Sequence, residues 1–331
     1  MKKYSIVPII AIMMVSACKL DFGDPGQDKR VGDFGMLRFN GGGGCNDSTS
    51  LALGSTARLE LEPAHEQPLP ADLVPRSSAP QVIGAAQGST ETEVILTAHQ
   101  VGITELEILA GGGLYDRLSF TAEPAVSADY AASESAYVGG GIIVEINELY
   151  GACGEDCPLI GGDFIQWSSK PESAFTVEIY DDRVALLVAN QVGSARIIGR
   201  EPTAGKVLVD HTVDVFPPDV SSELKSKFTV MLPDETLLDP SDMPASLPVG
   251  SLMWLELEAV NSDQRKISLA GRDVIWTVVG PAGVVEPWSE TADAQPLQGP
   301  IYLARAPGQV SLVAHVPMLD ELVSFEITVT E

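Results

Sequence analysis

Beyond residue 34, apolar and polar positions alternate along the chain in short segments with a period of two. The segments 58–62, 104–108, 254–258 and 324–329 show this alternation most strictly. Successive side chains of a strand point to opposite faces, so the pattern predicts strands with one buried and one solvated face. Long amphipathic helical patterns are absent, and the best helical candidate is the short segment 221–227. The sequence therefore predicts an all-β protein.

Glycine occurs at two equivalent positions in each of three repeats along the chain. Gly54, Gly139 and Gly250 each follow an apolar-x-apolar triplet and precede an alternating strand. A second set of glycines each begins a strand near the end of a repeat, namely Gly102, Gly193 and Gly308. Within each set the spacing is on the order of 100 residues, the length of one β-sandwich domain. The sequence therefore predicts three domains of similar construction.

A third landmark lies between these glycines in each repeat. It is an aspartate followed by two apolar residues, with a proline eight positions after the aspartate, and it begins at Asp72, Asp163 and Asp273. Tryptophan follows in the second and third copies, and the alignment sets Arg76 of the first copy against Trp167 of the second. A tryptophan at this position is expected to fill the space between two sheets.

Taken together, the glycine-entered strand, the Trp-Ser-Ser segment at 167–169 and the late glycine-started strand resemble bacterial Ig-like repeats. The resemblance covers most of residues 34–331. It implies tandem immunoglobulin-like β-sandwich domains at 34–124, 125–217 and 218–331. Because such repeats occur in adhesins, invasin-type proteins and surface lipoproteins, the resemblance also implies a surface location, without implying one ligand.

The first 17 residues have the layout of a secretory signal peptide. Two lysines precede an apolar run at 6–15, which is shorter than the roughly 20 residues that span a membrane. The segment Val15-Ser16-Ala17-Cys18 resembles the lipobox of bacterial lipoproteins. This resemblance implies cleavage before Cys18, diacylglycerol on its thiol and further acyl chains such as palmitate.

Two alternatives remain open for this region: an ordinary cleaved signal with a chance cysteine, and an uncleaved membrane anchor. Residues 18–33 are rich in Gly and Asp without apolar periodicity, so they are expected to form a flexible tether. Lys19 resembles the residue that directs enterobacterial lipoproteins to the outer membrane. We therefore expect a lipid-anchored protein of the cell envelope, at the outer membrane or cell surface.

The chain is strongly acidic, with 46 Asp and Glu against 20 Lys and Arg and a formal net charge of −26. The phosphates of nucleic acids repel such a chain, and so do anionic lipid headgroups. The composition therefore argues against nucleic-acid binding. It leaves membrane attachment to the lipid on Cys18.

Three cysteines follow Cys18, and export would place them in an oxidising compartment. Cys153 and Cys157 bracket a turn-forming Gly-Glu-Asp segment and are expected to close a small disulfide loop. Cys45 is then unpaired, or alternatively it joins one of the other two across domains. A metal site at this Cys-x3-Cys segment is disfavoured because none of the four histidines lies nearby at ligand spacing.

Motifs for catalysis or for a cofactor are lacking. The chain contains no Gly-x-Ser-x-Gly elbow, and the glycine run at 41–44 lacks the ending of a phosphate loop. We therefore expect no enzyme activity and no cofactor. A weak candidate for a calcium site comprises Asp234, Glu235, Asp239 and Asp242. The spacing of these residues fits no calcium motif, so acidic turns exposed to solvent are the favoured interpretation.

The resulting expectation is a non-enzymatic, lipid-anchored envelope protein whose Ig-like modules serve as spacer and as adhesion or protein-interaction units. One alternative is a structural accessory subunit of an envelope complex. Another is a carbohydrate-binding surface module, whose aromatic platform would comprise Tyr115, Tyr150, Tyr180 and Trp288. The expected partners are the membrane, through the lipid on Cys18, and an unidentified protein or glycan.

Overall fold

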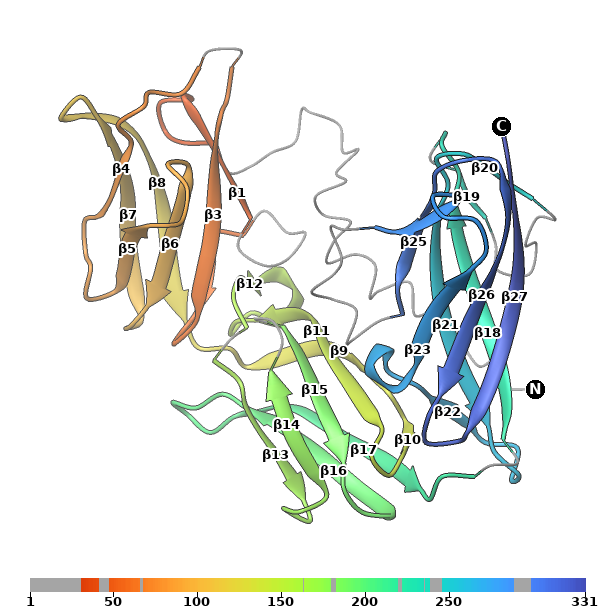
Figure 1. Ribbon diagram of the computed structural model, residues 1–331. Coiled ribbons are helices and arrows are strands. Elements are labelled where there is room, and N and C mark those ends of the chain that lie inside the picture. The colour runs from red at the N-terminus through yellow and green to blue at the C-terminus, as the bar shows by residue number, and fades with distance from the viewer. Residues whose placement is uncertain are drawn as a thin grey trace.

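The computed structural model describes residues 31–41, 48–65, 68–162, 164–179, 183–219, 222–234, 236–238, 246–288 and 299–331. These residues form strands joined by turns, together with two short 3₁₀ segments, η3 (Gly154–Asp156) and η5 (Gly271–Asp273). The strands build six sheets that pack in pairs as three β-sandwiches, named here modules 1, 2 and 3 (Figure 1). The prediction of an all-β protein with tandem Ig-like sandwiches is confirmed.

Module 1 contains two four-stranded sheets, with the orders β1-β3-β6-β5 and β2-β8-β7-β4. β2 pairs with β8 in parallel, and the other pairs are antiparallel. Its strands are β1 (Leu37–Gly41), β2 (Ser50–Ala52), β3 (Thr56–Pro63), β4 (Val74–Ser77), β5 (Ile83–Gln87), β6 (Glu93–Ala98), β7 (Gly102–Ala110) and β8 (Gly113–Glu123).

Module 2 repeats this plan. Its sheets have the orders β12-β11-β15-β14, with β9 also paired to β11, and β10-β17-β16-β13. Its strands are β9 (Ser127–Ala132), β10 (Ser135–Tyr137), β11 (Gly141–Tyr150), β12 (Pro158–Leu159), β13 (Gln166–Lys170), β14 (Phe175–Ile179), β15 (Val184–Ala189), β16 (Gly193–Arg200) and β17 (Val207–Phe216).

Module 3 also pairs two sheets, β19-β18-β21-β25-β24 with β22 on β21, and β20-β27-β26-β23. The short strands β10 and β20 join their sheets in parallel, as β2 does in module 1. Its strands are β18 (Glu223–Met231), β19 (Leu237–Leu238), β20 (Leu247–Pro248), β21 (Leu252–Val260), β22 (Lys266–Ser268), β23 (Ile275–Val279), β24 (Val285–Pro287), β25 (Ile301–Ala304), β26 (Gly308–Val316) and β27 (Glu321–Thr330).

The alternating sequence pattern places one side of each strand in a core between paired sheets. In β3, for example, Ala57, Leu59 and Leu61 are each 1% exposed, whereas the polar residues between them face solvent. The glycine landmarks have a backbone reason, because Gly54, Gly139 and Gly250 have φ of 85°, 86° and 95°. A side chain is strained in this left-handed region, so each repeat turns into its strand through glycine.

The segment 221–227, the best helical candidate, is not helical. Its described part enters β18, which pairs with β21 over nine residue positions. Glu, Leu and Lys favour a helix in isolation, but Leu224, Phe228 and Val230 also fit a strand that packs against a sheet. Pairing along a whole neighbouring strand outweighs that local preference.

The register of the sheets corrects the alignment of the tryptophan landmark. Trp167 lies opposite Gly199 and Trp276 opposite Ala314, each six residues beyond the glycine that starts its partner strand. In module 1 the residue in that register is Pro75, opposite Ile108. Arg76 is therefore not the counterpart of the tryptophans. Its guanidinium lies on the outside of the sheet, where Nε donates to Glu107 at 2.8 Å.

Candidate functional sites

The structure describes only part of the predicted site residues. Cys18 and Cys45 lie outside the described residues, as do Glu235, Asp239 and Asp242 of the calcium candidate. Asp234 is exposed, and its carboxylate accepts a hydrogen bond from the Thr236 backbone N–H at 3.1 Å. That bond holds the pKa of Asp234 below its usual value, so its structural role is to close a turn.

Metal-ligating side chains do not gather in the part of the chain that the structure describes: no three His, Cys, Asp or Glu residues are placed to hold an ion. The same part contains no helix that is long and apolar enough to cross a membrane. The aromatic candidates with described positions are spread over three modules. Tyr115 packs on the core of module 1, Tyr150 donates to Glu148 within β11, and Trp288 follows β24. Those three rings therefore do not form one platform.

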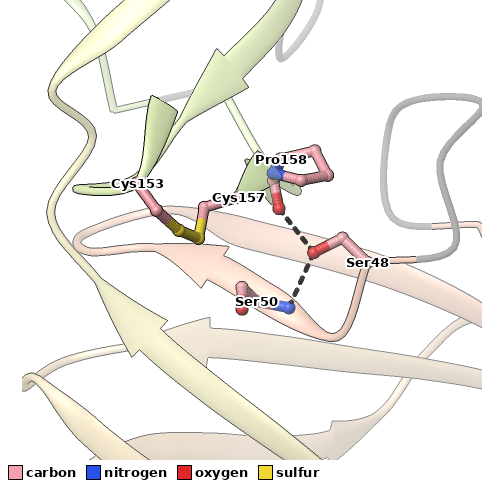
Figure 2. The surroundings of a disulfide bond; sticks show 5 residues. All are labelled: Ser48, Ser50, Cys153, Cys157 and Pro158. Carbon is pink, nitrogen blue, oxygen red and sulfur yellow. Dashed lines mark hydrogen bonds between the residues drawn. A yellow bond between two sulfur atoms is a disulfide. The ribbon is translucent and has the colours of Figure 1, made fainter. Parts of the chain in front are cut away.

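The Cys153–Cys157 loop lies at the contact between modules 1 and 2, called joint 1–2 here. The two cysteines form a disulfide around η3, with their Cα atoms 5.4 Å apart. Directly after it, the Pro158 carbonyl accepts a hydrogen bond from the Ser48 hydroxyl at 2.5 Å, and that hydroxyl accepts from the Ser50 backbone N–H at 3.0 Å (Figure 2). The small loop thus presents β12 to module 1.

Joint 1–2 continues as a short β-interaction across the two modules. The Ile160 backbone N–H donates to the Ser50 carbonyl at 2.8 Å, and the Ala52 backbone N–H donates to the Ile160 carbonyl at 3.0 Å. Ile160 is fully buried in the core of module 1, whereas Ala52 is fully buried in the core of module 2. Each module therefore completes the core of the other at this joint.

Asp273 is the central polar group at the contact between modules 2 and 3, called joint 2–3. Asp273 is 4% exposed, and it is the aspartate that begins the landmark of the third repeat. The carboxylate accepts from the Gly141 backbone N–H of module 2 at 3.0 Å and from the Ala270 backbone N–H of its own module at 2.9 Å. Burial raises the pKa of Asp273, and the two backbone hydrogen bonds oppose that rise.

Further contacts join modules 2 and 3 at this joint. They include a buried pair of hydroxyl groups, two ion pairs and a serine hydroxyl that donates a hydrogen bond to a backbone carbonyl of module 3. The contacts are Tyr137 with Ser222 at 2.5 Å, Ser135 with the Lys266 carbonyl at 2.6 Å, Arg265 with Asp214 at 3.1 Å, and Arg272 with Glu178 at 3.1 Å. Tyr137 itself packs in a core cluster of module 3. The joint is therefore a packed interface and not a free linker.

A second buried carboxyl group, that of Glu145, lies on β11. By strand alternation it shares a face with Ile143, which packs beside Leu186 and the module 3 residue Ala270. Glu145 is 2% exposed, and its Oε2 atom has no hydrogen-bond partner in the described structure. Burial without a partner raises its pKa to about 7, because the charged form loses its hydration.

We expect Glu145 to make the stability of module 2 depend on pH. Its folded pKa, about 7, lies above the ordinary value of 4.5, so the folded state binds the proton more tightly. The contribution of Glu145 to this stability should be constant below about pH 4.5, fall as pH rises towards 7, and level off above it. The fall should be on the order of 3 kcal/mol.

The variant Glu145→Gln should therefore be more stable than the parent at pH 8 and equally stable at pH 4. Hydrogen exchange of module 2 peptides, measured against urea at both pH values, reports this difference. Glu172→Gln, at an exposed position of the same module, is the matched control and should behave like the parent. A parent protein whose module 2 is as stable at pH 8 as at pH 4 would rule out the role of Glu145.

In the sequence, Asp273 is recognisable only as a repeat landmark. Its counterpart in module 1, Asp72, accepts from the Gly111 backbone N–H at 2.7 Å in an exposed turn. The same landmark therefore serves a turn in one module and a joint in another. Ile160 carried no signal at all, because an apolar residue after a short strand is ordinary in any sandwich.

No protein-family model and no curated protein matches the chain. Among solved structures, it is similar to domains 4–9 of the surface-layer protein SbsC, with 15% identity and a TM-score of 0.32 over 85% of this chain and 46% of that one. It is also similar to the Escherichia coli adhesin FdeC, with 14% identity and a TM-score of 0.27 over 85% of this chain and 94% of that one.

A third similar structure is invasin, a bacterial integrin-binding protein, with 13% identity and a TM-score of 0.26. The match covers 85% of this chain and 57% of the invasin chain. The chain thus spans less than two thirds of the SbsC and invasin structures. At such identities and TM-scores, these similarities say nothing about what this chain binds.

Proposed function

We propose that the protein is a non-enzymatic, lipid-anchored component of the bacterial cell envelope. Its three Ig-like modules serve as a spacer and as adhesion or protein-interaction units. The lipid on Cys18 holds the chain at the outer membrane or cell surface, and the following tether separates the modules from the lipid. The partner is a protein.

The observation that carries the spacer role is the construction of the two joints. At joint 1–2, Ala52 and Ile160 exchange places in the two cores and are linked by backbone hydrogen bonds. At joint 2–3, the buried carboxylate of Asp273 ties the two modules together. Packed joints restrict the motion of modules relative to one another, and a spacer needs that restriction to hold a binding surface at a defined place.

The exposed surfaces of the sheets support the interaction role, and the charge of the chain supports the lipid anchor. The paired sheets expose strand edges and outer faces, and these are the surfaces through which β-sandwich modules contact proteins. With a net charge of −26, the chain repels anionic headgroups, so a stable position at a membrane requires the lipid. Several acyl chains on one cysteine give such stability, whereas a single chain binds only marginally.

Replacing the lipid-bearing thiol tests the proposal. In cells that produce the full-length Cys18→Ser variant, we expect the protein to leave the membrane fraction, and mass spectrometry should detect no acyl mass. Cell adhesion to an extracellular-matrix surface should fall to the level of cells without the protein. Cys45→Ser is the control and should remain acylated, membrane-bound and adhesive. A Cys18→Ser protein that stays in the membrane fraction would contradict the anchor, and unchanged adhesion would contradict the interaction role.

A further inference from the structure

The outer face of the second sheet differs between module 3 and the other two modules. In module 1 this face carries cross-strand ion pairs, Arg76 with Glu107 and Arg117 with Glu105. In module 2 the corresponding face carries an ion pair of Arg196 with Asp210. Such charges keep the outside of a sheet solvated and discourage other proteins from packing on it.

Module 3 places uncharged residues at the corresponding register positions. In β23, Thr277 lies opposite Val313 where module 1 has Arg76 opposite Glu107, and Val279 lies opposite Ser311 where module 2 has Lys170 opposite Arg196. The same face of module 3 includes three large apolar side chains that are more than half exposed. They are Ile275 at 54%, Val279 at 53% and Leu322 at 67%.

β23 is also the edge strand of its sheet, because among the described residues it pairs with β26 alone. Its inward residues Trp276 and Val278 are partly exposed, whereas Leu312 and Ala314 of the neighbouring strand are fully buried. Within the part of the chain that the structure describes, the edge is therefore open to solvent. An open edge presents unpaired N–H and C=O groups that can pair with another strand.

The equivalent edges of modules 1 and 2 are protected, but β23 is not. β4 contains Pro75 and the charged Arg76, and β13 contains the charged Lys170. Proline and charge at an edge are the usual means of preventing strand addition. The sequence of β23, Ile-Trp-Thr-Val-Val, has neither, and it consists of residues that favour strands.

We propose that the free edge of β23 binds an extended segment of a partner protein by strand addition. The segment is uncharged and β-branched at its centre, so that alternate side chains pack on Ile275 and Val279. The flanks of the segment are basic. This site rests on the proposed interaction function of the modules and gives it a location.

Charge complementarity accounts for the basic flanks. Residues 218–331 contain 17 Asp and Glu against six Lys and Arg. The charged residues that precede β23 are already engaged, Arg272 with Glu178 and Asp273 with Gly141. An uncharged centre therefore matches the strand itself, whereas lysine or arginine on either side gains from the acidic module around it.

The position of β23 favours a single extended segment over a second copy of this chain. β23 begins at Ile275, two residues after Asp273, which is buried against module 2. In Figure 1, β23 accordingly begins on the side of module 3 that contacts module 2. A single added strand needs only the space of its own width beside β23. A second copy of the chain would instead bring three modules to this edge, next to module 2.

Disulfide trapping with a defined probe tests the site. The probe is a nine-residue peptide, Val-Thr-Cys-Thr-Val between two pairs of lysines, with its cysteine activated as a pyridyl disulfide. The full-length variants Thr277→Cys and Ser168→Cys are compared in detergent. Both residues are exposed and occupy the same register position, so Ser168→Cys is the matched control.

We expect the peptide to trap Thr277→Cys at least about five-fold faster than Ser168→Cys. N-methylation of alternate peptide amides should remove this difference, because it removes the backbone donors. Raising NaCl from about 0.05 to about 0.5 M should slow the trapping by screening the lysines. Equal rates at the two positions, or an unchanged rate for the N-methylated peptide, would overturn strand addition at β23.

A covalent dimer of Thr277→Cys formed in preference to the peptide adduct would overturn the peptide as occupant and identify a second copy instead. The trapping experiment needs neither acylation nor adhesion. A failure at β23 is therefore distinguishable from a failure of the proposed function, which the Cys18→Ser variant reports.

Discussion

Replacing Asp116 by alanine should destabilise module 1 by about 3–5 kcal/mol. Asp116 lies on β8 and is fully buried. Its carboxylate accepts hydrogen bonds from the backbone N–H groups of Phe34, Met36 and Leu37 at 3.0, 2.9 and 2.8 Å. It also accepts from the Arg117 backbone N–H at 2.8 Å. Alanine would leave these donors without their acceptor, and each buried donor left unpaired costs about 1–3 kcal/mol.

The effect should concentrate at the start of module 1, because three of the four donors lie just before or within β1. Hydrogen exchange measured by mass spectrometry should show faster exchange in peptides covering residues 31–41. The four tryptophans all lie beyond residue 160, so their fluorescence reports modules 2 and 3 and should change little. Native stabilities are commonly 5–15 kcal/mol, so the loss would leave module 1 marginal.

Glu105→Ala is the matched control for Asp116→Ala. Glu105 lies on the neighbouring strand β7, at the surface, and its carboxylate pairs with Arg117 at 3.3 Å. Exposed ion pairs contribute at most about 1 kcal/mol, so exchange in residues 31–41 should stay close to that of the parent. Asp116→Ala exchange that matches the Glu105→Ala pattern would show that the buried carboxylate does not hold the first strand.

Asp116 was visible in the sequence in principle. In β8 the inward positions are Asp116, Leu118, Phe120 and Ala122, so an aspartate occupies the apolar phase of an alternating strand. A charged residue in that phase is buried only when its oxygens are satisfied, and it thus predicts a hydrogen-bonding role. The identity of the donors was not predictable, because they lie about 80 residues earlier in the chain.

The repeat landmarks predicted the architecture because they reflect backbone geometry. Gly54, Gly139 and Gly250 recur because the same left-handed turn precedes the same strand in each module. The tryptophan landmark was misaligned by one residue in module 1, and such a slip exchanges the inner and outer faces of a strand. Pro75 faces inward there and Arg76 outward, which only the pairing with β7 reveals.

The joints could not be predicted from periodicity. Their contacts join residues of different repeats, such as Ile160 with Ser50 and Gly141 with Asp273, and each partner fits the pattern of its own strand or turn. The strand β18 was missed for a related reason. Its local composition favours a helix, and the nine positions of pairing with β21 that decide its conformation come from a later part of the chain.

Replacing Asp273 by alanine should loosen joint 2–3 and lower the stability of module 3 by about 2–5 kcal/mol. The change removes the acceptor of the Gly141 and Ala270 backbone N–H groups, and both donors lie in a buried environment. Part of the loss is offset because a carboxylate whose pKa is raised by burial no longer has to be desolvated. Two of the remaining contacts, Arg272 with Glu178 and Arg265 with Asp214, are exposed ion pairs that are too weak to replace the buried bonds. The bonds of Tyr137 with Ser222 and of Ser135 with the Lys266 carbonyl stay in place, so the joint loosens without coming apart.

Asp72→Ala tests the same landmark where it does not form a joint. The Asp72 carboxylate accepts one hydrogen bond, from Gly111, in an exposed turn, so its loss should cost less than about 1 kcal/mol. Small-angle X-ray scattering should show a wider distribution of distances for Asp273→Ala than for the parent and for Asp72→Ala. Hydrogen exchange should increase at Gly141 and around η5 in the same variant. If the scattering of Asp273→Ala equals that of the parent, the surrounding contacts hold the joint without this carboxylate, and Asp273 is a local turn residue as Asp72 is.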